Sequence, residues 1–426
     1  MRFLARRRTT AAMTTPLATS LVTGLVTGLV TGLVTGLVAA GPAHAQGTGP
    51  APAPGSFYDV PTELPGRNGD VIRSEPADFF LDPLKLLRAP ATARRVLYRS
   101  TDTHGTAIAV SGTVLTPHTP WAGPGPRPIV AYAPGTQGVG DECAPSRQMA
   151  MGSEYEGPFL SGLLLRGFGV VVTDYEGLGT PGVHTYVNRA AEAHAVLDSI
   201  RAAQRLPEAD LPDAGPVAIS GYSQGGGASA AAVELYRTYA PELDLKGAYA
   251  GAPPADLGVV AKNLDGHYAA GFLGYALLSL NAAYPELDIP ALLNDQGKQL
   301  MTQVEHQCTI EAVAAHAFRQ SKDLTRDGRK LEAYLTEEPY ASRVEQQRIG
   351  VRKPGAPVLV VHSVLDDIVP YGQAAEMVRK WCAQGANVKF SPSLAPTHVG
   401  GAIAAYPEAF AWLEARFADV PAHGNC

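Results

Sequence analysis

The stretch that decides the fold runs from 216 to 235 and reads PVAISGYSQGGGASAAAVEL. A short apolar run, a Gly-x-Ser-x-Gly motif at 221–225 and a helix-forming run follow one another directly. A serine on a tight turn from strand to helix needs small residues two positions before and after it, because strand and helix approach closely there. The helix N-terminus beneath such a serine favours negative charge that develops on it. Ser223 is therefore the candidate nucleophile.

The residues downstream decide between a nucleophile and a simple glycine-rich turn, since a chain with 45 glycines contains such motifs by chance. Asp366 follows the apolar run 357–362, at the end of a late strand where a triad carboxylate must lie. Asp367 is the alternative acid, although it is also placed to cap the helix that begins near Tyr371. His398, in a loop before the final helix, is the candidate base. The order serine, acid, histidine is typical of an α/β-hydrolase.

The oxyanion that forms during acyl transfer needs hydrogen-bond donors already in place. One donor is expected to be the backbone N–H of Gln224, which follows the nucleophile. The second is expected from the loop Ala133–Gly138 after an early strand, with the N–H of Thr136 preferred and that of Gln137 as the alternative. We expect no metal and no cofactor, because Cys-x-x-Cys and His-rich clusters are missing from the sequence.

Alternation of short apolar runs with helical stretches predicts an α/β fold, in which helices flank a mostly parallel central sheet. Expected strands are 107–115, 128–133, 167–173, 216–220, 246–250, 357–362 and 387–391, and expected helices include 190–205, 224–239, 371–383 and 401–418. The rhythm breaks between 250 and 357, where helical spacing recurs over a length unusual for a crossover. We interpret 254–345 as an inserted helical cap, and 57–253 with 346–426 as the hydrolase core.

Composition limits the class of protein. With 46% hydrophobic and 17% charged residues, the chain has ample material for a folded core. The net charge of −6 provides no basic field, which argues against nucleic acid as a partner. A monomer is the default, and contact with a lipid interface is expected to be transient.

The N-terminus predicts export. Residues 1–45 hold four arginines and no acidic residue, then an apolar stretch that ends in Ala43-His44-Ala45, a small-x-small cleavage pattern. The alternative is a retained membrane anchor, which the following Pro/Gly/Ala-rich linker at 46–56 disfavours. Cleavage after Ala45 leaves 30 basic and 40 acidic residues, a net charge of −10. We therefore expect a secreted, extracellular protein; the export route, Sec or twin-arginine, stays open.

The cysteines Cys143, Cys308, Cys382 and Cys426 are even in number, as expected for disulfides in an exported chain. Three pairings are possible in principle, and spacing does not choose among them.

Motifs along nearly the whole mature chain resemble the secretory lipase family typified by Candida antarctica lipase A, with its actinobacterial relatives. These motifs are Phe57-Tyr58, Ile72-Arg73, the Pro-Gly-Thr loop at Pro134, Glu142-Cys143-Ala144-Pro145-Ser146, Asp174-Tyr175-Glu176-Gly177-Leu178-Gly179, 221–226, 366–370 and 382–387. The resemblance implies an α/β-hydrolase core, a helical cap that holds an acyl chain, and the triad Ser223, Asp366 and His398. It also implies the disulfides Cys143–Cys308 and Cys382–Cys426.

The function expected from residues and resemblance together is hydrolysis of carboxylic esters, with acylglycerols as the expected substrate. A serine peptidase or an acyltransferase is the alternative on the same fold, because the same groups act on any acyl carbon. A binding protein without activity is the third reading, disfavoured because all three triad positions have candidates.

Overall fold

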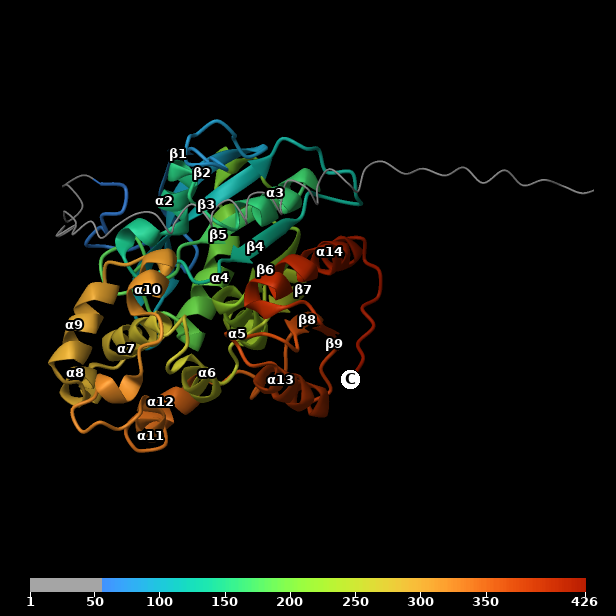
Figure 1. Cartoon of the computed structure of the whole chain (residues 1–426). Coiled ribbons are helices and arrows are strands. Elements are labelled where there is room, and N and C mark those ends of the chain that lie inside the picture. The colour runs from blue at the N-terminus through green and yellow to red at the C-terminus, as the bar shows by residue number, and fades with distance from the viewer. Residues whose placement is uncertain (1–55) are drawn as a thin grey trace, which may run out of the picture. The chain divides into compact units, whose positions relative to one another are not determined.

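The computed structural model describes residues 56–426, which include the central sheet. The predicted signal peptide and positions 46–55 lie outside this range. Nine strands follow the order β1-β2-β3-β5-β4-β6-β7-β8-β9 (Figure 1). The strands are β1 (Val71–Ala77), β2 (Ala91–Thr101), β3 (Ala107–Pro117), β4 (Ile129–Ala133), β5 (Gly169–Thr173), β6 (Pro216–Tyr222), β7 (Asp244–Gly251), β8 (Val358–Ser363) and β9 (Val388–Ser393). Strands β1 to β3 pair antiparallel, β3 also pairs antiparallel with β5, and all pairs from β5 to β9 are parallel. The sheet is mostly parallel, as predicted.

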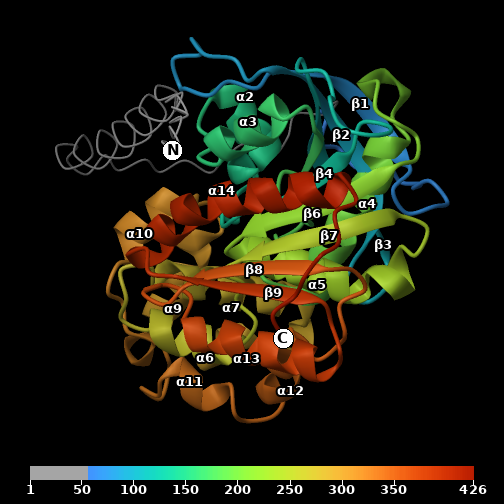
Figure 2. The ribbon, with the colours of Figure 1, turned by 90° about the vertical axis from the view of Figure 1, so that its right-hand side faces the viewer.

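Helices cover both faces of this sheet (Figure 2). One face packs against α4 (Arg189–Gln204), α5 (Gln224–Tyr239) and α13 (Tyr371–Ala383), and the other against α2 (Pro145–Met151), α3 (Gly157–Leu165) and α14 (Thr397–Phe417). Successive residues of β4 alternate between the two cores: Ile129 and Ala131 join the first, whereas Val130 and Tyr132 join the second. Burial on both faces explains why the strand reads as a continuous apolar run.

Between β7 and β8 the chain is mainly helical, as expected for residues 254–345. The helices are α6 (Leu257–Leu264), α7 (Gly271–Ala283), α8 (Ile289–Leu292), α9 (Asp295–Val304), α10 (Thr309–His316), α11 (Leu331–Tyr334) and α12 (Tyr340–Gln346), which gather at one end of the sheet (Figure 1). Phe272 and Leu273 of α7 form a hydrophobic cluster with Ile368 and Val369, which follow β8. Core and cap therefore share buried apolar surface near the carboxyl end of β8; the exact limits of the cap stay a prediction.

Sequence patterns missed the first two strands and misplaced the start of α14. Strands β1 and β2 carry Arg73, Arg94 and Arg95, which interrupt their apolar runs. The final helix begins at Thr397 and not near Gly401. Glycine at 401 suggests a loop, but a Cβ there would clash with the Tyr222 hydroxyl, so this glycine permits close packing inside a helix.

Two disulfides join distant segments: Cys143 to Cys308 and Cys382 to Cys426. These are the pairs that the family resemblance implies. The first connects the start of α10 in the cap to the segment before α2, beside a single β-bridge between Gly138 and Cys308. The second fixes the C-terminal tail to α13. No helix within residues 56–426 is long and apolar enough to cross a bilayer.

Removal of either disulfide should destabilise the protein, and removal of the first should cost more. The sequence separations are 165 and 44 residues, so the chain-entropy model predicts losses of about 5 and about 4 kcal/mol in the free energy of unfolding. Denaturant unfolding of the C143S/C308S and C382S/C426S double variants would measure both. A larger loss in the C382S/C426S variant would contradict this ranking.

Candidate active site

Ser223 lies on the turn between β6 and α5 with φ 59° and ψ −123°, a conformation that serine rarely adopts. Its N–H donates to the Gly251 carbonyl on β7 at 2.9 Å. A Cβ on Gly225 would overlap the carbonyl oxygen of Ala133, and one on Gly226 would overlap that of Gly251. The glycines of the motif therefore let α5 begin directly against β4 and β7, which holds the serine at the carboxyl edge of the sheet.

Asp366 follows β8, and its side chain is fully buried. Its carboxylate accepts hydrogen bonds from His398 Nδ1 at 2.7 Å and from the N–H groups of Ile368 and Val369 at 3.0 and 2.8 Å. Burial opposes its charge, but hydrogen bonds from His362 and His398 outweigh burial and hold the pKa of Asp366 well below its usual range. The residue is thus a permanent anion that faces an imidazole.

His398 lies in the first turn of α14, where the sequence had suggested a loop. Its Nδ1 carries the proton, since the Asp366 carboxylate only accepts, and this leaves Nε2 as the basic nitrogen. The ring packs against that of Tyr222, with 4.9 Å between centroids, and the Tyr222 hydroxyl donates to the His398 carbonyl at 2.8 Å. The structure thus brings the histidine against the residue that precedes Ser223.

Asp367 supports the histidine. It does not cap α13, the helix near Tyr371 for which the sequence had offered it as a cap. Its Oδ1 accepts the His398 N–H at 2.8 Å, and its Oδ2 accepts the Tyr268 hydroxyl from the cap at 3.0 Å. The N-cap position of α13 is Pro370, without a side-chain cap. Asp366 is therefore the carboxylate at the imidazole, and Asp367 holds the backbone of His398.

His362 and Tyr222 also contact the acid and the histidine, which the sequence patterns did not predict. His362 Nε2 donates to the Val369 carbonyl at 2.9 Å and lies 3.3 Å from Asp366 Oδ2. A histidine at the end of the strand that precedes the acid was the available signal. Tyr222 is inside the motif, but its contact with His398 depends on a fold that brings together segments 176 residues apart.

The loop Pro134–Gly138, here called the oxyanion loop, packs against the serine turn, because Gly225 leaves no space between them. Its carbonyls are occupied: Pro134 O accepts the Tyr175 hydroxyl, and Thr136 O accepts the hydroxyls of Tyr155 and Thr309. Within residues 56–426, the N–H groups of Thr136 and Gln137 donate to no protein acceptor. Both predicted donors are therefore available.

Gln224 is buried, and its side chain holds the start of α5. Its Nε2 donates to His184 Nε2 at 3.0 Å and to Glu192 Oε1 at 2.8 Å. Burial lowers the pKa of His184 to about 4 and raises that of Glu192 to about 8. Both partners are therefore neutral near pH 7, and this layer behind the serine adds no net charge.

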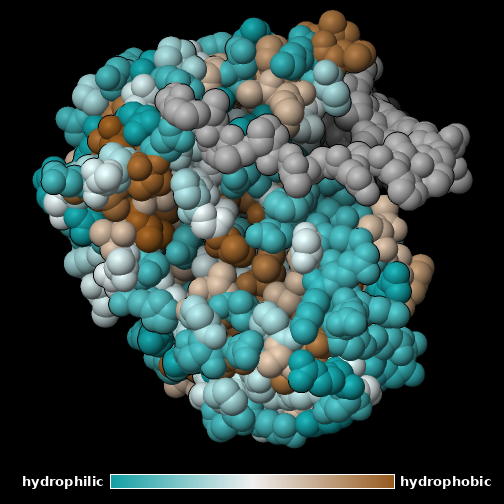
Figure 3. All heavy atoms as spheres, turned by 90° about the vertical axis from the view of Figure 1, so that its left-hand side faces the viewer, coloured by the Kyte–Doolittle hydropathy of each residue, from teal (hydrophilic) through white to brown (hydrophobic). Residues whose placement is uncertain are grey.

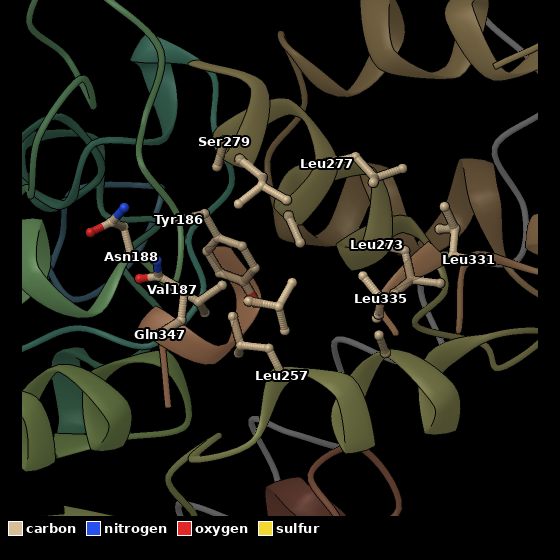
Figure 4. A pocket seen from close by; sticks show the side chains of 14 residues that line it. Tyr186, Val187, Asn188, Leu257, Leu273, Leu277, Ser279, Leu331, Leu335 and Gln347 are labelled. Carbon is tan, nitrogen blue, oxygen red and sulfur yellow. The ribbon is translucent and has the colours of Figure 1, made fainter. Parts of the chain in front are cut away.

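An apolar pocket begins at Ser223 and Gln224 and runs between the serine turn and the cap. Its lining includes Val187, Leu264 and Phe272. A second pocket shares Tyr186, Val187, Leu257, Ala261, Leu273 and Ala276 with the first and extends to Leu331, Leu335 and Val344. Leucine side chains of α6, α7 and α11 face one another across it (Figure 4). The two pockets, here called the apolar channel, thus lead away from Ser223 and Gln224. No cluster of His, Cys, Asp and Glu within residues 56–426 is suited to hold a metal ion.

The sheet order, a strained serine after β6, and the acid and histidine after β8 and β9 define an α/β-hydrolase fold. A solved structure of Candida antarctica lipase A in its closed state matches with a TM-score of 0.72 and 28% identity over 84% of each chain. A family model described as secretory lipase matches residues 144–425. The chain therefore belongs to the secretory lipase family, as its motifs indicated.

Two curated relatives extend this likeness. A Mycobacterium tuberculosis protein named probable inactive lipase is 33% identical over 367 residues, which cover 83% of this chain and 79% of that protein. Lipase A of Moesziomyces aphidis is 31% identical over 365 residues, which cover 80% of this chain and 75% of that protein. Family membership supports a hydrolase; whether this chain is active depends on its own site.

Substitution of Gly225 by alanine should disrupt the serine turn. The new Cβ would overlap the Ala133 carbonyl, and overpacking of this kind costs about 1–3 kcal/mol. We expect a clear fall in Tm together with loss of activity. Gly372→Ala in α13 is the matched control, because a Cβ there meets nothing within 4 Å. Equal Tm values for the two variants would contradict the proposed close packing.

Proposed function

We propose that this protein is a secreted, serine-dependent carboxylic-ester hydrolase that acts on acylglycerols or related esters. The observation that carries the proposal is the Asp366–His398 pair, which lies beside the strained Ser223 turn at the mouth of an apolar channel. A buried carboxylate that orients an imidazole, and a serine on a strained turn after a strand, are the groups that acyl transfer to a serine uses.

In this mechanism, His398 Nε2 removes the proton of Ser223 Oγ as that oxygen attacks the ester carbonyl. Asp366 keeps Nδ1 protonated and stabilises the imidazolium that forms. The N–H groups of Gln224 and of Thr136 or Gln137 bind the oxyanion, and His398 then returns its proton to the leaving alcohol. Water, activated by the same histidine, attacks the acyl-enzyme and releases the acid.

The channel favours an ester with an apolar acyl group over a peptide. Its walls are aliphatic and aromatic, and none of its lining side chains in residues 56–426 is a Lys, Arg, Asp or Glu that could hold a peptide terminus. An acyltransferase uses the same site, so product analysis with a competing alcohol is needed to separate the two outcomes.

Exposed apolar side chains near the site support transient contact with a lipid surface. Val399 and Ile403 on α14 are 55% and 42% exposed, and Ile310 on α10 is 57% exposed. On the face that carries α8 to α10, hydrophobic residues are exposed in patches among polar ones (Figure 3). Secretion itself is supported by family membership and by the two disulfides.

Replacement of Ser223 by alanine should abolish ester turnover without unfolding the protein. The measurement is hydrolysis of p-nitrophenyl esters from acetate to palmitate by residues 46–426, with Tm as the folding control. Loss of the nucleophile should lower kcat at least about 10³-fold. Turnover that survives in the Ser223→Ala variant would refute the serine mechanism, and a folded wild-type protein without turnover would liken it to the Mycobacterium tuberculosis relative named probable inactive lipase.

Obstruction of the channel should change acyl-length preference. Ala276 on α7 lines both pockets, so Ala276→Phe should lower kcat/KM for palmitate at least about tenfold relative to acetate. Ala282→Phe, on an exposed position of the same helix, is the matched control. If both variants keep the wild-type ratio, the acyl chain does not occupy this channel.

A further inference from the structure

Two buried glutamates, Glu154 and Glu156, lie directly behind the oxyanion loop, with only 6% and 5% of their surfaces exposed. Glu156 Oε2 accepts the Gly135 N–H at 2.8 Å and Gln137 Nε2 at 3.3 Å, and its Oε1 accepts the Tyr132 hydroxyl at 2.8 Å. Glu156 thus holds both backbone and side chain of the loop that supplies the second oxyanion donor.

Glu154 is attached to the same loop through a shared amide. Its Oε1 accepts Gln137 Nε2 at 3.2 Å and the Glu156 N–H at 3.0 Å. The Gln137 amide nitrogen therefore lies between the two carboxyl groups, while Gln137 Oε1 accepts Gln148 Nε2 at 2.8 Å. Glu154 Oε2 has no hydrogen-bond partner within residues 56–426. An unpartnered oxygen is far less costly on a neutral carboxyl group than on an anion.

No cation compensates the pair: neither glutamate forms an ion pair within residues 56–426. The titratable groups that face the two carboxyl groups are neutral or acidic: Tyr132 on β4, Tyr155 before α3, Tyr175 and Asp174 after β5, Tyr249 on β7 and Tyr406 on α14. Two neighbouring carboxylates in such an environment do not both ionise near neutral pH.

The order of ionisation follows from the donors. Burial and the charge of Glu156 raise the pKa of Glu154 to about 8. Burial also raises the pKa of Glu156, to about 7, although hydrogen bonds from Gly135, Tyr132 and Gln137 stabilise its anion. Glu156 is therefore the carboxyl group that loses its proton first, and Glu154 stays neutral over a wider range of pH.

We propose that Glu154 and Glu156 are positioning residues of the oxyanion loop, and that the loop is held in its productive geometry while the two carboxyl groups retain at least one proton between them. The inference rests on the proposed function. Glu156 accepts the Gly135 N–H. The next two N–H groups of the loop, those of Thr136 and Gln137, stay available to the oxyanion. Loss of the last proton places two anions on either side of the Gln137 amide, and their repulsion displaces the loop.

The same proton makes stability depend on pH. A carboxyl group with a raised pKa stabilises the folded state in full below its unfolded pKa of about 4.5, and this contribution is lost as pH rises toward the folded value. For Glu154 this window runs to about pH 8. The side-chain amide of Glu154→Gln has no proton to lose in this range, so the variant should lose less stability than wild type as pH rises.

The first test compares wild type with Glu154→Gln from pH 5 to pH 9. Each kcat profile is normalised to its own maximum, and Tm is followed over the same range. We expect the alkaline fall in wild-type kcat to move up by at least one pH unit in the variant, and the variant to lose less Tm between pH 5 and 9. Parallel profiles and parallel Tm curves would overturn the proposal.

The second test addresses positioning. Glu156→Ala, which removes the oxygens that accept from Gly135, Gln137 and Tyr132, should lower kcat at least about tenfold with KM within about twofold, because oxyanion contacts form in the transition state. Tyr132→Phe, which removes a hydrogen bond to Glu156, should lower kcat in the same way. Tyr249→Phe is the matched control, because its buried hydroxyl has no partner within residues 56–426. A rise in KM alone, or equal effects of the two tyrosine variants, would overturn the positioning role.

The experiments distinguish failure of the carboxyl-pair proposal from failure of the proposed ester hydrolysis. Wild-type turnover that depends on Ser223, combined with unchanged pH behaviour in Glu154→Gln, would reject the carboxyl pair and keep the ester hydrolase. Turnover that does not depend on Ser223 would reject both.

Discussion

Close contact between the start of α5 and the strands beside it is the constraint on which the site depends. The α-carbon of Gly225 lies against the Ala133 carbonyl, and that of Gly226 against the Gly251 carbonyl. Ser223 adopts a positive φ in the turn just before these glycines, and the oxyanion loop, which continues from Ala133, lies beside it. One packing contact thus places Ser223 beside the loop Pro134–Gly138, before any side-chain hydrogen bond is considered.

The histidine reaches this turn from another part of the chain through a second set of contacts. Tyr222, inside the motif, holds the His398 carbonyl, and Asp367 holds its N–H. Asp367 also accepts the Tyr268 hydroxyl, and Asn263 of α6 donates to the carbonyls of Asp367 and Ile368. Residues 254–345 therefore do more than line the apolar pockets: they also hold the loop that carries Asp366 and Asp367.

Residue patterns predicted the parallel half of the sheet, α5 and α13 to the residue, and the acid–histidine pair, because these features depend on local periodicity and on chain order. They failed where tertiary packing overrides local preference. Arginines on β1 and β2 concealed two strands, and the glycines after His398 suggested a loop where close packing requires a helix. The roles of Asp367, His362 and the Glu154–Glu156 pair depend on contacts across the fold, which spacing does not encode.

The central claim is that Ser223 is the nucleophile of a site assembled by these contacts. The most direct measurement is reaction with a p-nitrophenyl alkylphosphonate, which traps an activated serine covalently, followed by peptide mapping with mass spectrometry. We predict one adduct, on Ser223, formed in step with loss of esterase activity and greatly slowed in His398→Ala. An adduct on another residue, or full inhibition without an adduct on Ser223, would contradict the account.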